Sequence, residues 1–99
     1  MEIIKTVNGT ELTLQVIGRL DTSTSPALES ELCGSIEGVT DLILDFEGLE
    51  YVSSAGLRVI LTAQKTMNRN QGKMIVKNVN QDIKEVFEIT GFCDILTIE

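Results

Sequence analysis

Apolar and polar residues alternate in the first part of the chain, where β-branched residues are frequent. Residues 2–7 and 10–17 share this composition and flank Asn8-Gly9, a pair that tolerates the positive φ angles of a tight hairpin turn. In the second segment every other residue is apolar, which is typical of a strand with one face in the core. We therefore predict a β-hairpin, after which residues 18–21 lead out of the sheet. The predicted inward positions are Leu12, Leu14 and Val16.

Three later segments repeat their apolar residues every three or four positions, the period of an amphipathic helix. The first helix starts within residues 22–26, where several hydroxyls can form a cap and proline fits the first turn. The second covers about residues 53–70, and the third is capped by Asn80 and ends at Gly91. The inward positions are Leu28, Leu32 and Ile36, then Leu57, Ile60, Leu61 and Gln64, then Ile83, Val86, Phe87 and Thr90, with Phe92 folding back onto the last turn.

Continuous apolar runs lie between the predicted helices, at residues 42–44 and 74–76. Such runs are typical of strands that are covered on both faces. A short strand at residues 95–98 closes the chain. After the hairpin, helices and strands alternate, and right-handed crossovers bring strands into parallel pairs. We therefore predict an α/β fold: a single domain over residues 1–99, with an N-terminal hairpin and a mixed sheet covered by helices.

The chain is acidic, because 15 acidic and 8 basic side chains give a net charge of −7. A negative surface repels the phosphate backbone of nucleic acids, and the scattered basic residues form no patch for an anionic membrane. The sequence starts without the features of a signal peptide and shows no apolar run long enough to cross a bilayer. We expect a cytoplasmic protein that binds neither nucleic acid nor membrane directly. Cys33 and Cys93, the two cysteines, are expected to be reduced.

The chain contains no histidine, the usual general base near neutral pH and a common metal ligand. It also lacks the glycine motifs of phosphate-binding loops and dinucleotide folds. We expect no catalytic residue, no cofactor and no metal. One alternative stays open, in which Asp21 and Asp45, both expected at strand ends, form a carboxylate pair for a divalent cation or for acid–base catalysis. In the simpler interpretation, Asp21 accepts hydrogen bonds in a turn and Asp45 ends a strand.

Residues 51–57 place two hydroxyls and the small step Ala55-Gly56 where a connection turns into a helix. In the simpler interpretation, serine caps the helix and Gly56 permits close packing against a strand. In the functional interpretation, Ser53 or Ser54 is phosphorylated, which adds about −1.5 to −2 charges where a positive helix end tolerates them. A partner packed on that surface would then be released, because the new charge would have to be desolvated.

Four segments in one order resemble a known family and together span nearly the whole chain. They are residues 18–21 (GRLD), 44–49 (LDFEGL), 51–61 (YVSSAGLRVIL) and 87–92 (FEITGF). The chain resembles a stand-alone STAS domain of the bacterial anti-sigma factor antagonists. In that family, the unphosphorylated antagonist binds an anti-sigma factor that is also a serine kinase, and a sigma factor is released. The resemblance implies a substrate and inhibitor of the kinase, not an enzyme.

The resemblance also implies where the switch lies. In that family the anti-sigma factor serine kinase uses ATP and magnesium to phosphorylate a serine at the helix start, which is Ser54 here, and a serine phosphatase reverses the reaction. The preceding residue, often aspartate in the family, is Ser53, which makes Ser53 the rival acceptor. Both serines lie in one turn of chain, and we expect similar exposure for them. A constitutive STAS scaffold subunit, in which both serines are only caps, is the alternative function. The expected partner-binding residues are Asp21, Thr22, Ser23, Ser53, Ser54, Gly56 and Arg58.

Overall fold

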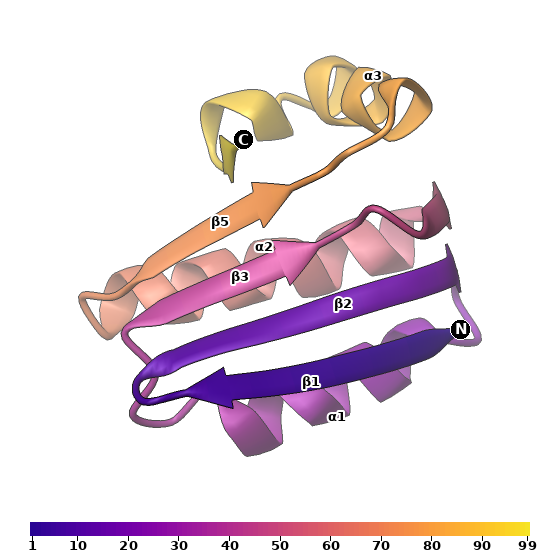
Figure 1. Ribbon diagram of the computed structural model, residues 1–99. Helices are drawn as coiled ribbons and strands as arrows, with labels where there is room; N and C mark the ends of the chain where they lie inside the picture. The colour runs from indigo at the N-terminus through magenta and orange to yellow at the C-terminus, as the bar shows by residue number, and fades with distance from the viewer.

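The computed structural model describes residues 1–99 and contains a six-stranded sheet with three α-helices (Figure 1). The strands are β1 (Glu2–Asn8), β2 (Glu11–Leu20), β3 (Asp41–Asp45), β4 (Leu49–Val52), β5 (Lys73–Lys77) and β6 (Thr97–Ile98). The helices are α1 (Ser25–Ser35), α2 (Ser54–Arg69) and α3 (Gln81–Thr90), with a 3₁₀ helix η1 (Phe92–Asp94). The sheet order is β1-β2-β3-β5-β6, and β4 pairs with the end of β2. Only β1 and β2 are antiparallel, which confirms the predicted hairpin and mixed α/β sheet.

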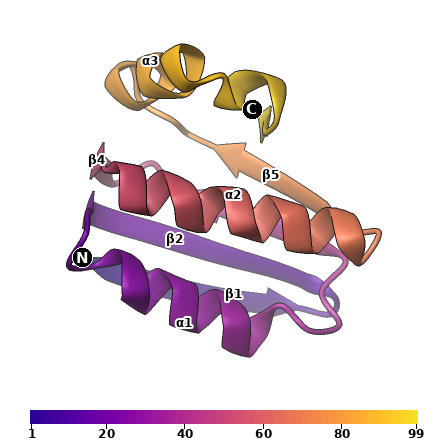
Figure 2. The same ribbon diagram turned by 180° about the vertical axis from the view of Figure 1, so that it is seen from behind.

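Helices α1 and α2 lie on one face of the sheet, and the opposite face carries no helix (Figures 1 and 2). α3 lies beyond the carboxyl end of β5. In β3, Leu42 and Leu44 are buried under the helices, whereas Ile43 between them is half-buried on the opposite face. β5 repeats this alternation. The prediction that these two strands are covered on both faces is therefore wrong, because α1 and α2 cover the same side.

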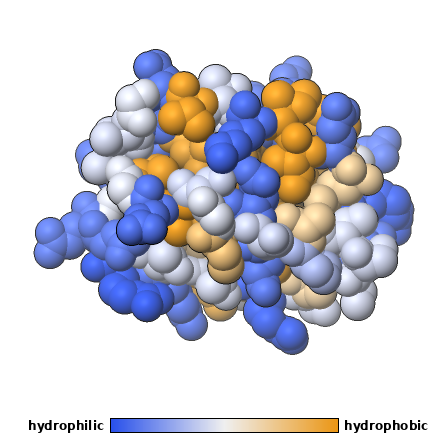
Figure 3. All heavy atoms as spheres, turned by 90° about the horizontal axis from the view of Figure 1, so that it is seen from below, coloured by the Kyte–Doolittle hydropathy of each residue, from blue (hydrophilic) through white to orange (hydrophobic).

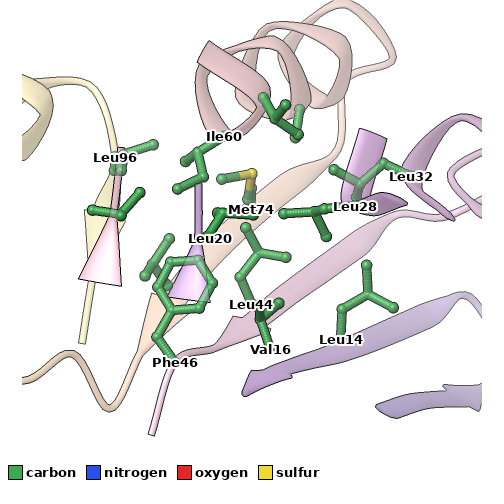
Figure 4. Close-up of a cluster of buried hydrophobic side chains, with 14 of the residues drawn as sticks. Leu14, Val16, Leu20, Leu28, Leu32, Leu44, Phe46, Ile60, Met74 and Leu96 are labelled. Carbon is green, nitrogen blue, oxygen red and sulfur yellow. The ribbon is translucent and has the colours of Figure 1, made fainter. Parts of the chain in front are cut away.

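A single apolar core fills the space between the sheet and the two covering helices (Figure 4). Strand residues Leu14, Val16 and Leu44 meet Leu28 of α1 and Ile60 of α2, and all five are fully buried. Burying an aliphatic side chain of this size contributes about 1.5–3 kcal/mol before the loss of chain entropy is counted. Leu14, Val16, Leu28 and Ile60 are inward positions that the two sequence periods predict, and Leu44 belongs to the apolar run at residues 42–44, so these core positions follow from the pattern of the chain.

Strand β2 is longer than predicted and changes partner along its length. It pairs with β3 up to Gln15 and with β4 from Gly18 onward, and the register shifts between Gly18 and Arg19. Gly18 has a φ of +100°, a conformation that residues with side chains rarely adopt. Glycine thus lets the strand move from one partner to the other. The expectation that residues 18–21 leave the sheet is wrong for residues 18–20, which pair with a strand that was not predicted.

The two ends of α3 have the predicted caps. The Asn80 side chain accepts a hydrogen bond from the N–H three residues later at 2.9 Å, and Gly91 is left-handed with a φ of +81°. Phe92 folds back so that its ring stacks on Phe87, with 6.2 Å between ring centroids. These predictions are confirmed. Thr90 is the exception, because its side chain is exposed and donates to a backbone carbonyl of the preceding turn.

Strand β1 forms an edge of the sheet, next to α1. Seen from this side, groups of hydrophobic residues lie among hydrophilic ones (Figure 3). The Lys5 ammonium donates to the Ser35 hydroxyl at 2.8 Å and lies 3.6 Å from a Glu31 carboxylate oxygen. This bridge ties the edge strand to α1. A lysine on an edge strand also discourages pairing with a strand of another molecule.

Candidate functional site

The end of β2 and the start of α2 lie side by side, although they are far apart in sequence. Leu20 pairs with Val52 of β4, and the Ser53 N–H donates to the Leu20 carbonyl at 2.8 Å. The turn after β2 and the helix start after β4 therefore leave the sheet at the same place. This pairing brings together six of the expected partner-binding residues: Asp21, Thr22, Ser23, Ser53, Ser54 and Gly56.

The two serines at this helix start have different environments. Ser53 is half-buried and caps α2, because its Oγ accepts a hydrogen bond from the Gly56 N–H at 3.3 Å. Ser54 is the first helical residue, its side chain is exposed, and its hydroxyl makes no hydrogen bond within the chain. The sequence suggested similar exposure at both positions. That expectation is wrong because a capping side chain turns toward the free N–H groups, whereas the next residue points outward.

The backbone at the start of α2 presents unpaired donors. The N–H groups of Ser54 and Ala55 have no acceptor within the chain, since the first helical bond runs from Leu57 to the Ser53 carbonyl at 2.9 Å. The first turn contains no acidic residue. A helix of this length carries a partial positive charge at its N-terminus. The start of α2 can therefore hold an added negative group.

Gly56 sets how closely α2 approaches the strands. A Cβ atom at this position would lie 2.8 Å from Leu20 Cγ and 2.9 Å from Val52 Cγ2. At such distances the neighbouring side chains have to shift. The φ angle of Gly56 is not positive, so the requirement for glycine here is steric. The predicted close packing is confirmed, and it fixes the serines relative to the turn after β2.

Asp21 organises that turn. Its Oδ1 accepts hydrogen bonds from the Ser23 N–H at 3.0 Å, the Ser23 hydroxyl at 2.8 Å and the Thr24 N–H at 3.1 Å. The Thr24 hydroxyl donates to the Arg19 carbonyl at 2.8 Å, and the Ser25 hydroxyl donates to the Asp21 carbonyl at 2.6 Å. The bond from the Ser23 hydroxyl, with smaller help from the others, holds the pKa of Asp21 below its ordinary value despite some desolvation.

These bonds also correct the prediction for the start of α1. The sequence indicated that hydroxyls in residues 22–26 cap the helix. Thr24 is the N-cap residue but makes no side-chain capping bond, because its hydroxyl is engaged by the turn. Pro26 does lie in the first turn, as predicted. The Thr22 side chain is exposed and makes no hydrogen bond within the chain.

A contact between Arg19, which starts the turn expected beside Ser54, and Tyr51 extends the surface, and the sequence did not predict this contact. Arg19 and Tyr51 are partners across β2 and β4, and the guanidinium carbon lies 4.3 Å from the centre of the tyrosine ring. Arg19 Nε is also 3.9 Å from Asp21 Oδ2. A cation over a tyrosine ring contributes about 0.5–1 kcal/mol at an exposed site. Finding this pair requires the register between β2 and β4, which no local pattern supplies.

Arg58 lies one turn after Ser54 on the exposed side of α2. Its guanidinium forms no ion pair, since the ion pairs of the chain are those of Lys5 and Arg19. The structure therefore places Arg58 next to the site without joining it to Asp21. Its charge is free for an external group or for a group added at Ser54, because residues four apart are neighbours on a helix.

Asp45 and the two cysteines lie outside this site. Asp45 pairs with Gln15 of β2, which is six residues before Asp21, a separation of about 20 Å along a strand. The carboxylate pair that the sequence left open is therefore not formed, because the bulged β2 carries Asp21 far beyond the end of β3. Cys33 and Cys93 are free thiols.

Comparison with known proteins identifies the family. The STAS domain family matches residues 2–99. BtrV of Bordetella bronchiseptica, assigned as an anti-sigma factor antagonist, is 35% identical over 82 residues, which is 82% of this chain and 71% of that protein. The anti-sigma-B factor antagonist of Staphylococcus aureus is 31% identical over 86 residues, 86% of this chain and 80% of that protein.

Solved structures agree in fold. The anti-sigma factor antagonist SpoIIAA in its unphosphorylated form has a TM-score of 0.80 at 19% identity, covering 99% of this chain and 87% of its own. A Thermotoga maritima protein assigned to the same class has a TM-score of 0.91 at 16% identity, covering 97% and 84%. No helix of the present chain combines the length and the apolar character that a membrane span requires. The chain belongs to the STAS domain family and, within it, to the anti-sigma factor antagonists.

Proposed function

We propose that this antagonist is switched by phosphorylation of Ser54. In its unphosphorylated form it binds an anti-sigma factor that is also a serine kinase, and a sigma factor is released. The observation that carries the proposal is the exposed, unbonded hydroxyl of Ser54 at the start of α2, next to a Ser53 that is engaged as the cap. Ser54 is therefore the acceptor and Ser53 is not.

The antagonist supplies no catalytic group to its own modification. The kinase holds ATP and magnesium, the bond between the γ-phosphorus and the ADP oxygen breaks, and a bond forms from that phosphorus to Ser54 Oγ. The hydroxyl proton passes to a base of the kinase. A serine phosphatase returns the protein to its binding form by hydrolysis. Both enzymes are partners, and the chain is their substrate in the cytoplasm.

The fold is suited to carry the phosphate. The unpaired N–H groups of Ser54 and Ala55 and the positive end of α2 can hold phosphate oxygens. The exposed Arg58 side chain, one turn later, adds a positive charge. The modified protein thus keeps its structure, and the phosphate acts by weakening the binding of the partner.

The kinase would lose its binding surface. We assign to that surface Asp21, Thr22, Ser23, Ser53, Ser54 and Arg58. Gly56, which the sequence also suggested, is buried beneath it and acts by setting the position of α2. A phosphate adds about −1.5 to −2 charges beside the ionised Asp21. A partner packed there would have to desolvate this charge, which the helix end and Arg58 neutralise only in part, and that is unfavourable. Phosphorylation therefore separates the complex.

Mass spectrometry with site mapping tests the proposal. The protein is purified from its own cells, before and after incubation with ATP, magnesium and native lysate. We expect one phosphoryl group on Ser54, its loss in Ser54→Ala, and its retention in Ser53→Ala. Phosphate on Ser53 would keep the mechanism and correct the site. Absence of phosphate under every growth condition would instead favour the constitutive scaffold.

Binding measurements on two variants distinguish the effect of a negative charge at Ser54 from the effect of a negative charge elsewhere on the chain. Ser54→Asp should abolish capture of the kinase from native lysate, whereas Ser30→Asp should not. Ser30 is also an exposed serine, but it lies on α1 away from the start of α2. Equal capture by both variants and the unchanged protein would contradict the assigned surface.

A further inference from the structure

The helix-free face of the sheet has an ordered pattern of charge. Pairing of β3 with β5 sets Asp41 beside Lys73 and Asp45 beside Lys77, with an isoleucine pair between these rows. All of these side chains are on the face opposite α1 and α2, because Leu42, Leu44, Met74 and Val76 alternate with them and are buried. We call this set the open face: Asp41, Ile43, Asp45, Lys73, Ile75 and Lys77.

The charged side chains of the open face form no ion pairs within the chain. The ion pairs of the structure involve Lys5 and Arg19, so neither Lys73 nor Lys77 has a carboxylate partner within 4.0 Å. The carboxylates make single-oxygen contacts. Asp41 Oδ2 accepts from the Thr40 hydroxyl at 3.1 Å, and Asp45 Oδ1 accepts from the Asn78 amide at 3.0 Å and the Glu47 N–H at 3.1 Å. Each keeps one oxygen unbonded.

We propose that the open face binds the open face of a second copy of this chain. Two sheets can pack face to face with nearly aligned strands. A two-fold axis parallel to the strands, between β3 and β5, lays β3 of one copy over β5 of the other. Each aspartate then faces a lysine of the second copy, and Ile43 faces Ile75. Such a two-fold contact uses the same patch on both molecules.

The charge pattern also selects this arrangement against its main competitor. A two-fold axis across the strands would lay β3 over β3 with its direction reversed, so that Asp41 faces Asp45 and Lys73 faces Lys77. Like charges that face each other across an interface cost several kcal/mol. Only the axis along the strands joins opposite charges.

The balance of charge favours this face over other surfaces for self-association. Two aspartates and two lysines cancel on β3 and β5, in a chain whose net charge is −7. Because the chain is acidic, copies that approach through a surface with an excess of carboxylates repel each other. The site at Ser54 stays accessible, since α2 lies on the opposite face of the sheet (Figures 1 and 2). The proposal therefore does not depend on the phosphorylation switch.

The size of the face sets the expected strength. Strands about 4.8 Å apart and five residues at about 3.3 Å each make a small contact, below the area of a standard interface. We expect a dimer that exchanges with monomer, measurable by sedimentation velocity in a concentration series up to about 1 mM. A chain that stays monomeric over this whole series would overturn the proposal.

A pair of charge-reversed variants gives the decisive test. Asp41→Lys alone and Lys73→Glu alone should each lower the association constant at least about tenfold, because each sets like charges opposite in the homodimer. Their equimolar mixture should associate again, since the substituted position 41 of Asp41→Lys then faces the substituted position 73 of Lys73→Glu with opposite charge. This recovery also shows that both variants are folded.

The matched control is Lys65→Glu, which makes the same charge change at an exposed position of α2 on the other side of the sheet. It should leave self-association within about twofold. If Asp41→Lys and Lys73→Glu associate as strongly as the unchanged protein, the open face is not the interface. If the mixture does not recover, the paired arrangement is wrong.

Discussion

The start of α1 and the start of α2 both carry several hydroxyl side chains, but these hydroxyls differ in their hydrogen bonds. At the start of α1, the hydroxyls of Ser23, Thr24 and Ser25 are hydrogen-bonded in the turn of Asp21, and only that of Thr22 is exposed and unbonded. Before α2, the Ser53 hydroxyl is engaged, while that of Ser54 is exposed and unbonded. A hydroxyl that stabilises a turn would lose that role on modification. The comparison shows that a candidate switch needs both a hydroxyl without a hydrogen bond and a place in the first helical turn, as at Ser54, and that a high density of hydroxyls is not enough.

Among substitutions at the two helix starts, the largest loss of stability is expected at Gly56. This residue lets the start of α2 pack closely against the strands. Gly56→Ala should lower the free energy of unfolding by about 1–3 kcal/mol, because its Cβ would overlap Leu20 and Val52. Urea denaturation measures this. Gly34→Ala is the matched control, since Gly34 is helical with no atom within 4 Å of its added Cβ, and it should gain about 0.5–1 kcal/mol. Equal stability changes of one sign would contradict the steric role of Gly56.

Substitutions at the two serines should change stability less than Gly56→Ala, and Ser53→Ala should be the more destabilising of the two. Ser53→Ala removes the capping acceptor of the Gly56 N–H and should cost about 1 kcal/mol of unfolding free energy. Ser54→Ala removes an exposed hydroxyl without a hydrogen bond and should stay within about 0.5 kcal/mol. Denaturation of the two variants side by side measures the difference. A larger cost for Ser54→Ala would mean that Ser54 has a structural role.

Sequence patterns predict the core and the helices because these depend on local periodicity. Leu14, Val16 and Ile60 are buried as the two periods require. The errors fall where a contact distant in sequence decides. The run at residues 42–44 resembles a strand covered on both faces, and only the placement of α1 and α2 on one side exposes Ile43. β4 is too short to show a period, and its pairing with β2 is invisible locally.

The candidate site was predictable in part for the same reason. The helix start with two serines is a local pattern, and its residues were found. Which serine is free depends on side-chain direction at the cap, and the Arg19–Tyr51 contact depends on the register of β2 against β4. The family resemblance supplied the neighbourhood of Asp21 and Ser54. Structure was needed to show that the Ser54 hydroxyl is free, whereas those of Ser23, Thr24, Ser25 and Ser53 are hydrogen-bonded.

The smallest expected effect is an acid sensitivity of the turn at Asp21. Because its hydrogen bonds lower the pKa of the folded form below the ordinary value of 3.8, ionised Asp21 stabilises the fold above that value. This contribution is lost as the pH falls through the lowered pKa. Asp21→Asn does not titrate, so its stability should fall less on acidification than that of the unchanged protein. Urea denaturation between about pH 2 and 5 measures the unfolding free energies of the two proteins. The contributions of the other carboxylates are the same in both and cancel in the difference. Parallel curves for the two proteins would show that the turn does not depend on the carboxylate charge, and the contrast between the two helix starts would then rest on their hydroxyls alone.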